Sequence, residues 1–128
     1  KLYYRYYYFS AHFYLFYIIS AALALRRDQP DVIVVLNFSQ FVPVLRRIMP
    51  RATIVLVMQC DWLVELDEDK IVVRLEKTDL ILGCSDYITT GIQRKFPGLQ
   101  EKCYTLYNGS NASMFVRARA RAASSLPA

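Results

Sequence analysis

Four short apolar runs alternate along the chain with segments whose apolar residues recur at helical spacing. The runs lie near residues 32–37, 53–58, 79–84 and 103–107. Short apolar runs of this kind are typical of parallel strands whose two faces are both buried. Because helical segments separate the runs, the pattern predicts an α/β, Rossmann-like partial domain with a mostly parallel sheet and flanking helices, connected in the right-handed sense. The first run is predicted to be a central strand.

The clearest strand–helix–strand unit lies between residues 78 and 109. Ser85 follows the third run at the position of a helix N-cap, and Asp86 in the first turn favours the positive end of the helix dipole. One apolar helix face is formed by Tyr87, Ile88, Ile92 and Phe96. The face predicted to point to solvent carries Gln93, Arg94 and Lys95. Pro97 and Gly98 then end the helix.

Polar side chains follow the ends of the predicted strands. Because ligands of open α/β sheets bind beyond the carboxyl ends of the strands, these positions supply the candidate cleft residues. They are Asn37, Ser39, Gln59, Asp61, Trp62, Ser85, Asn108 and Gly109. The alternative role of Ser39 is to cap the next helix, expected over residues 40–49. The alternatives for Asp61 and Trp62 are a helix cap and a packed side chain.

The titratable residues do not predict a metal or cofactor site in this chain. The acidic run over residues 65–69 suits the first turn of a helix, which Ile71, Val72 and Leu75 continue as one apolar stripe. The three cysteines lack metal-ligand spacing, and His12 is the single histidine. Neither a glycine-rich phosphate loop nor a Ser/His/Asp constellation occurs in the sequence.

The first 29 residues form an aromatic-rich helical segment that holds most of the ten tyrosines. Three interpretations stand: a helix packed on the sheet, a membrane-associated or membrane-spanning segment, and a signal peptide. Tyrosines in the middle of the segment argue against a membrane span, whose aromatic residues gather at its two ends. His12 is expected to be a packed histidine and not a ligand.

Composition narrows the function classes. A hydrophobic content of 55% excludes a disordered chain, and a length of 128 residues allows one domain, placed at 30–115 and followed by a disordered or frayed tail at 116–128. The net charge of +5 comes without a cluster of cations interleaved with exposed aromatic residues, so nucleic-acid binding is not predicted. The expected location is cytoplasmic, with a peripheral or anchored position at a membrane as an alternative.

The residues from the third run onward resemble the end of the N-terminal domain of family-4 retaining glycosyltransferases, which have the GT-B fold. The shared pattern is an aspartate, an apolar strand, a serine, a helix, Phe-Pro, a strand, Tyr-Asn-Gly and a later phenylalanine. It is carried here by Asp79, Ser85, Phe96, Pro97, Tyr107, Asn108, Gly109 and Phe115. The similarity extends back to about Pro30.

This resemblance implies transfer of a hexose from a nucleotide-sugar to a glycan, lipid or protein acceptor. It implies that a separate C-terminal domain holds the nucleotide-sugar and that this chain supplies the acceptor-side walls, so the chain alone is expected to be inactive. The family also implies a histidine where this chain has Val57 and Gln59. Gln59 and Asp61 would then contact a sugar hydroxyl, and Trp62 would form an apolar platform.

Two other functions compete with this hypothesis. The first is a non-catalytic α/β interaction module, which the missing histidines favour. The second is a membrane-anchored fragment, which the hydrophobic residues 1–25 favour.

Overall fold

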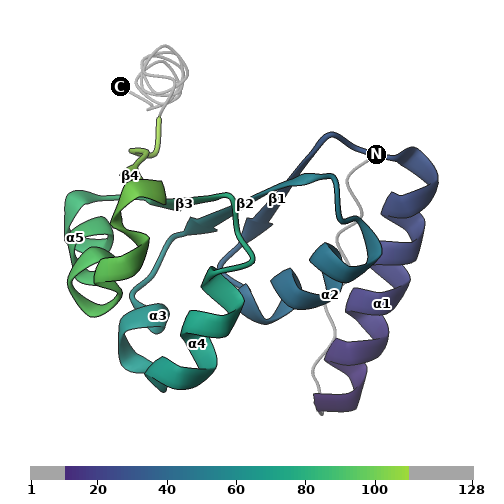
Figure 1. Cartoon of the computed structure of the whole chain (residues 1–128), viewed down its shortest axis with the longest axis horizontal. Helices are drawn as coiled ribbons and strands as arrows, with labels where there is room; N and C mark the ends of the chain where they lie inside the picture. The colour runs from purple at the N-terminus through teal and green to yellow at the C-terminus, as the bar shows by residue number, and fades with distance from the viewer. Residues whose placement is uncertain (1–10, 110–128) are drawn as a thin grey trace, which may run out of the picture.

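The computed structural model describes residues 11–109, with residues 11–14 described by their backbone alone. Its elements, labelled in Figure 1, are α1 (Ala11–Asp28), β1 (Val32–Leu36), the 3-10 turn η1 (Ser39–Phe41), α2 (Val42–Ile48), β2 (Thr53–Met58), α3 (Trp62–Glu65), α4 (Glu68–Leu75), β3 (Leu80–Gly83), α5 (Asp86–Lys95), the 3-10 segment η2 (Pro97–Lys102) and β4 (Cys103–Thr105). Each strand ends within two residues of its predicted boundary. The helix predicted over 40–49 is instead a 3-10 turn followed by α2.

The strands form one parallel sheet in the order β1-β2-β3-β4. Val34 pairs with Val55 at the first junction, and Leu82 pairs with Tyr104 at the last. Because all four strands run in the same direction, their carboxyl ends lie along one edge of the sheet. The predicted α/β, Rossmann-like fold with a parallel sheet is confirmed.

In the view of Figure 1, α2, α3 and α4 lie below the sheet, α5 lies at its left end and α1 stands on the far right, and the core lies between the sheet and the helices. Buried strand residues meet buried helix residues there: Ile33, Val35, Ile54, Leu56 and Ile81 from the strands, and Leu45, Ile71, Leu75 and Ile92 from the helices. Each such side chain contributes roughly 1.5–3 kcal/mol when it is fully buried.

The opposite face of the sheet is apolar and is exposed along its two edge strands, whereas Val55 and Val57 of β2 are only 9% exposed there. Val32, Val34 and Leu36 are 54%, 59% and 58% exposed, and Tyr104 and Leu106 are exposed to a similar extent. The prediction that the first run is a central strand buried on both faces is therefore wrong, because β1 is an edge strand of the described sheet. When consecutive strands are neighbours and all crossovers have one hand, every connecting helix falls on the same face.

Helix α1 packs beside α2. Ile18 and Ala22 are buried, and the Tyr17 ring lies 6.1 Å from the Phe41 ring in η1. This contact agrees with the packed-helix interpretation, and Ile18 and Ala22 belong to the same hydrophobic core as the strand residues Ile33 and Val35. Within residues 11–109, no helix is both long and apolar enough to cross a membrane. The sequence predicts a packed role for His12, but its side chain is outside the part of the chain that the structure describes. The same holds for the tyrosines of residues 1–10.

Arg46 clamps the amino edge of the sheet. Its guanidinium donates hydrogen bonds to the carbonyl oxygens of Lys77 at 3.1 and 3.2 Å, of Pro50 at 3.2 Å and of Ala52 at 2.8 Å. It also donates to a carboxylate oxygen of Asp79 at 2.5 Å. One side chain at the end of α2 therefore ties together the loops that precede β2 and β3.

Asp79 is the charged acceptor among the hydrogen-bond partners of Arg46, and we call this group of contacts the clamp. Its carboxylate also accepts the Ile54 backbone N–H at 2.6 Å. Partial burial disfavours the charge, but the Ile54 N–H, Arg46 and Lys102 together outweigh that cost, so the pKa of Asp79 is lowered from its ordinary value of 3.8. The aspartate of the glycosyltransferase-like pattern therefore has a structural role in this chain.

The lowered pKa of Asp79 predicts a specific acid sensitivity. A carboxyl group whose pKa is lower in the folded chain stabilises the fold above its unfolded pKa, and this stabilisation is lost as the pH falls through the folded value. The wild-type chain should therefore lose stability more steeply than Asp79→Asn as the pH falls below 3.8. Urea unfolding of both chains between pH 6 and pH 2 measures this difference, and parallel curves would contradict it.

Candidate functional site

Asn37 turns the chain over the carboxyl edge of the sheet. Its φ of 60° lies in the left-handed region, which asparagine tolerates better than most residues. Its backbone N–H continues the ladder to the Val57 carbonyl at 2.8 Å, and its side-chain oxygen accepts the Gln59 backbone N–H at 2.7 Å. The predicted strand-end residues Asn37 and Gln59 are therefore joined directly.

Gln59 and Asn108 form a reciprocal amide pair at the same edge. The Gln59 Nε2 group donates to Asn108 Oδ1 at 3.3 Å, and the Asn108 Nδ2 group donates to Gln59 Oε1 at 2.7 Å. The pair spans from the end of β2 to the segment after β4, across the end of β3. Each amide has two N–H groups, so within the described part of the chain one donor on each side chain remains for a ligand at this exposed position.

Ser85 and Asp86 lie at the start of α5, directly after the carboxyl end of β3. The Ser85 hydroxyl accepts the Ile88 backbone N–H at 3.4 Å, which confirms the predicted helix cap. Asp86 accepts hydrogen bonds from the Tyr107 hydroxyl at 2.5 Å and the Thr105 hydroxyl at 2.7 Å. Both bonds lower the pKa of Asp86, and the bond from Tyr107 has the larger effect. The same bond raises the pKa of Tyr107.

An open hollow of about 830 Å³ lies between α3 and α5 and begins at Asp86. Asp61 and Glu65 line it from α3, and Arg94 and Lys95 line it from α5. The hollow therefore presents both charges. Asp86 at the rim of this hollow accepts a hydrogen bond from Tyr107. Because Asn108 follows Tyr107 in the chain, the hollow lies near the amide pair.

Among the described residues, the other predicted site residues make no hydrogen bond to the Gln59 or Asn108 side chain. Ser39 is buried inside η1, and it does not cap α2, which begins at Val42 without a side-chain cap. Asp61 occupies the N-cap position of α3, although its side chain makes no capping bond. Trp62 is 49% exposed, and its ring lies edge-on to Phe38 at 6.4 Å. Gly109 is exposed at the end of the described chain.

Tyr107 and Thr105 were not predicted as site residues, and Asp86 was predicted only as a charge at the helix start. The available signal was positional. Asp86 follows the helix cap at the carboxyl edge, and β4 ends at that edge, so polar side chains from both had to meet there. The sequence alone does not show which oxygen of Asp86 each hydroxyl reaches.

The described side chains, those of residues 15–109, contain no group of three or more His, Cys, Asp or Glu placed to hold a metal ion. Cys60, Cys84 and Cys103 are unpaired thiols, and burial raises the pKa of Cys103 to about 11. At neutral pH that thiol is therefore uncharged and a poor nucleophile.

Searches of protein-family models, curated proteins and solved structures find no match to this chain. The resemblance to a glycosyltransferase family therefore remains an expectation from the sequence. Phe115, the last residue of that pattern, and the tail predicted at 116–128 lie outside the described residues. The structure shows that the described residues form a small α/β domain with a four-stranded parallel sheet.

Proposed function

We propose that residues 30–109 form the acceptor-side wall of a sugar-binding cleft in a glycosyltransferase that moves a hexose from a nucleotide-sugar. The observation that carries this proposal is the Gln59–Asn108 amide pair at the carboxyl edge of the sheet. The proposed role is to bind an acceptor and hold it in place. The donor would lie on further polypeptide, and this chain alone would not transfer sugar.

The chemistry of the edge suits a sugar. A sugar hydroxyl both donates and accepts hydrogen bonds, and the Gln59 and Asn108 amides offer both groups side by side in a fixed orientation. The Asn37 oxygen holds the backbone at Gln59, and so limits the entropy that the site would lose on binding. Trp62 is half exposed and starts α3 shortly after the carboxyl end of β2, where its ring could pack against a sugar ring.

Binding by this edge is tested with free hexoses added to the isotope-labelled chain. We expect the side-chain amide signals of Gln59 and Asn108 to shift in a saturable way, together with the fluorescence of Trp62, the single tryptophan. Asn108→Ala should weaken binding about tenfold, because it removes one hydrogen-bonding partner and frees Gln59. Gln100→Ala is the matched control, since that amide bonds to the Gln93 carbonyl on another part of the surface.

A folded chain that shows no shift with any hexose would contradict the proposal. The competing function, a non-catalytic interaction module, would then be favoured. The exposed apolar sheet face formed by Val32, Val34 and Leu36 supports that alternative, because parallel sheets are nearly always covered on both faces. Its partner would present an uncharged, apolar surface.

A further inference from the structure

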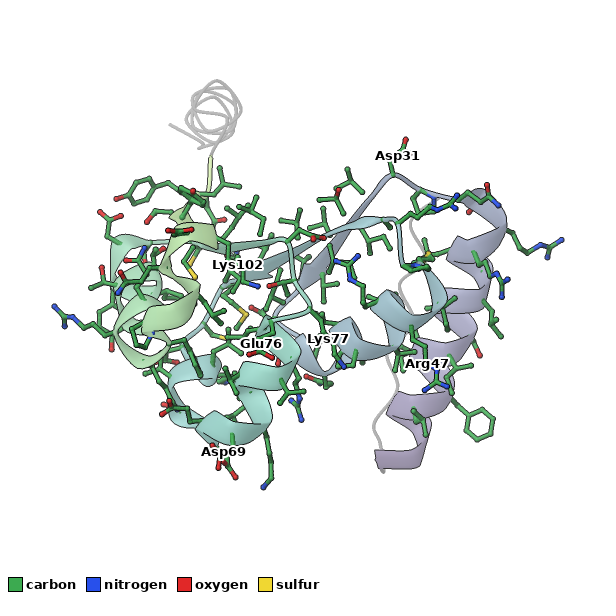
Figure 2. All side chains as sticks on the ribbon, viewed as in Figure 1. Asp31, Arg47, Asp69, Glu76, Lys77 and Lys102 are labelled. Carbon is green, nitrogen blue, oxygen red and sulfur yellow. The ribbon has the colours of Figure 1, made fainter. Side chains whose placement is uncertain are left out.

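A cationic hollow lies between α1 and α2, on the helical side of the molecule. Its volume is about 1030 Å³, and four cations line it: Arg26, Arg46, Arg47 and Lys77. The remaining lining is apolar or proline, and none of the described lining residues is acidic. In Figure 2, Arg47 lies beside α1 and Lys77 lies beside α2.

Three of these cations are available to a ligand. Arg46 is occupied by Asp79 and by backbone carbonyls. The exposed side chains of Arg26, Arg47 and Lys77, by contrast, have no ion pair or hydrogen bond within residues 11–109. Arg26 and Arg47 also complement the dipoles at the ends of α1 and α2, but that effect needs one charge at each helix end and does not gather three around one hollow.

An apolar stripe on α1 leads directly into this hollow. Phe16, Ile19 and Leu23 are 74%, 38% and 50% exposed, and their spacing places them on one side of the helix. Arg26 follows one turn later on the same side, and both Ile19 and Arg26 line the hollow. A soluble phosphate would use the cations but would have no use for the stripe.

We propose that α1 and the cationic hollow dock this chain on the surface of an anionic phospholipid bilayer. Lipid phosphates accept hydrogen bonds from Arg26, Arg47 and Lys77, while Phe16 and Leu23 enter the boundary between headgroups and acyl chains. Apolar and cationic side chains arranged in this way are typical of helices that lie in the membrane interface. The proposal is independent of the sugar-binding edge, which uses other residues.

Sedimentation with vesicles tests this surface. The chain should bind vesicles of phosphatidylcholine mixed with phosphatidylserine and should bind phosphatidylcholine alone much more weakly. The double variant Arg47→Gln, Lys77→Gln should bind the anionic vesicles about 25-fold more weakly, at about fivefold for each charge removed. The control Arg74→Gln, Arg94→Gln removes the same net charge from α4 and α5 and should keep most of the binding.

The apolar stripe needs its own comparison. Phe16→Ser should weaken vesicle binding, whereas Tyr87→Ser, which removes another exposed aromatic ring on α5, should not. Equal binding to both vesicle types, or equal losses in the two double variants, would overturn the proposal. The proposal would also be overturned if the chain bound inorganic phosphate through Arg47 and Lys77 but did not bind anionic vesicles.

Discussion

Replacing Arg46 with Met is expected to lower the free energy of unfolding by about 3 kcal/mol. The substitution keeps an unbranched apolar stem but removes the guanidinium that Asp79 and the carbonyls of Lys77, Pro50 and Ala52 share. Among the described residues, the Asp79 carboxylate would keep the hydrogen bond from the Ile54 N–H and the more distant charge of Lys102, and the partly buried carbonyl of Ala52 would lose its donor. Urea unfolding followed by circular dichroism measures the change.

The neighbouring Arg47 is the matched control. It belongs to the same last turn of α2, but its guanidinium is exposed and has no partner within the described residues. Arg47→Met should therefore change the free energy of unfolding by less than about 0.5 kcal/mol. Arg46→Lys should restore only part of the loss, because an ammonium group cannot reach several acceptors with the planar fork of a guanidinium. Equal losses at both positions would show that the clamp does not stabilise the fold.

Local patterns predicted the strands and the start of α5 because their causes are local. A run of β-branched residues, a serine followed by an aspartate, and Phe-Pro-Gly each act within a few residues. The clamp between Arg46 and Asp79 joins residues 33 apart, and no local pattern marks it. The same holds for Lys95, predicted to face solvent, whose ammonium donates to the Val64 carbonyl at 2.6 Å and also to that of Leu66.

The sequence did not predict the exposed sheet face, because exposure of a strand also depends on residues far away in the chain. An apolar run indicates that a strand suits burial, but the order of the strands decides which faces have helices to cover them. Alternation between buried and exposed positions in β1 therefore follows from topology, since both sets of side chains are apolar. Gln93 shows the same limit at a single residue, because its amide donates to the Cys103 carbonyl at 3.0 Å instead of pointing to solvent.

The candidate site was partly predictable because parallel strands end at one edge. That rule brings Asn37, Gln59 and Asn108 to a common edge, and the structure adds that they bond to one another. The rule does not say how the chain turns after each strand. Ser39 is therefore carried into the interior by η1, whereas Asp86 meets Tyr107 through the packing of α5 against β4.

Gly83→Ala is expected to lower the free energy of unfolding by about 2–3 kcal/mol, because the added methyl group has no room. A Cβ atom at position 83 would lie 2.4 Å from Thr89 Oγ1 and 2.8 Å from the Thr89 backbone nitrogen. The φ of Gly83 is not positive, so close approach of α5 to β3 is the reason for glycine here. Gly98→Ala is the control, since a Cβ there meets no atom within 4 Å.

The steric clash between the Cβ atom added in Gly83→Ala and Thr89 should also disturb the candidate site. Thr89 is buried, donates to the Ser85 carbonyl at 3.1 Å, and its hydroxyl oxygen lies 2.9 Å from that of Thr105, so a shift of α5 also moves the residues around Asp86. Adding Thr89→Ala to Gly83→Ala removes the nearer contact but leaves the backbone nitrogen in place, and we expect it to recover less than half of the loss. Full recovery, or equal stability of Gly83→Ala and Gly98→Ala, would mean that the approach of α5 to β3 is not tight.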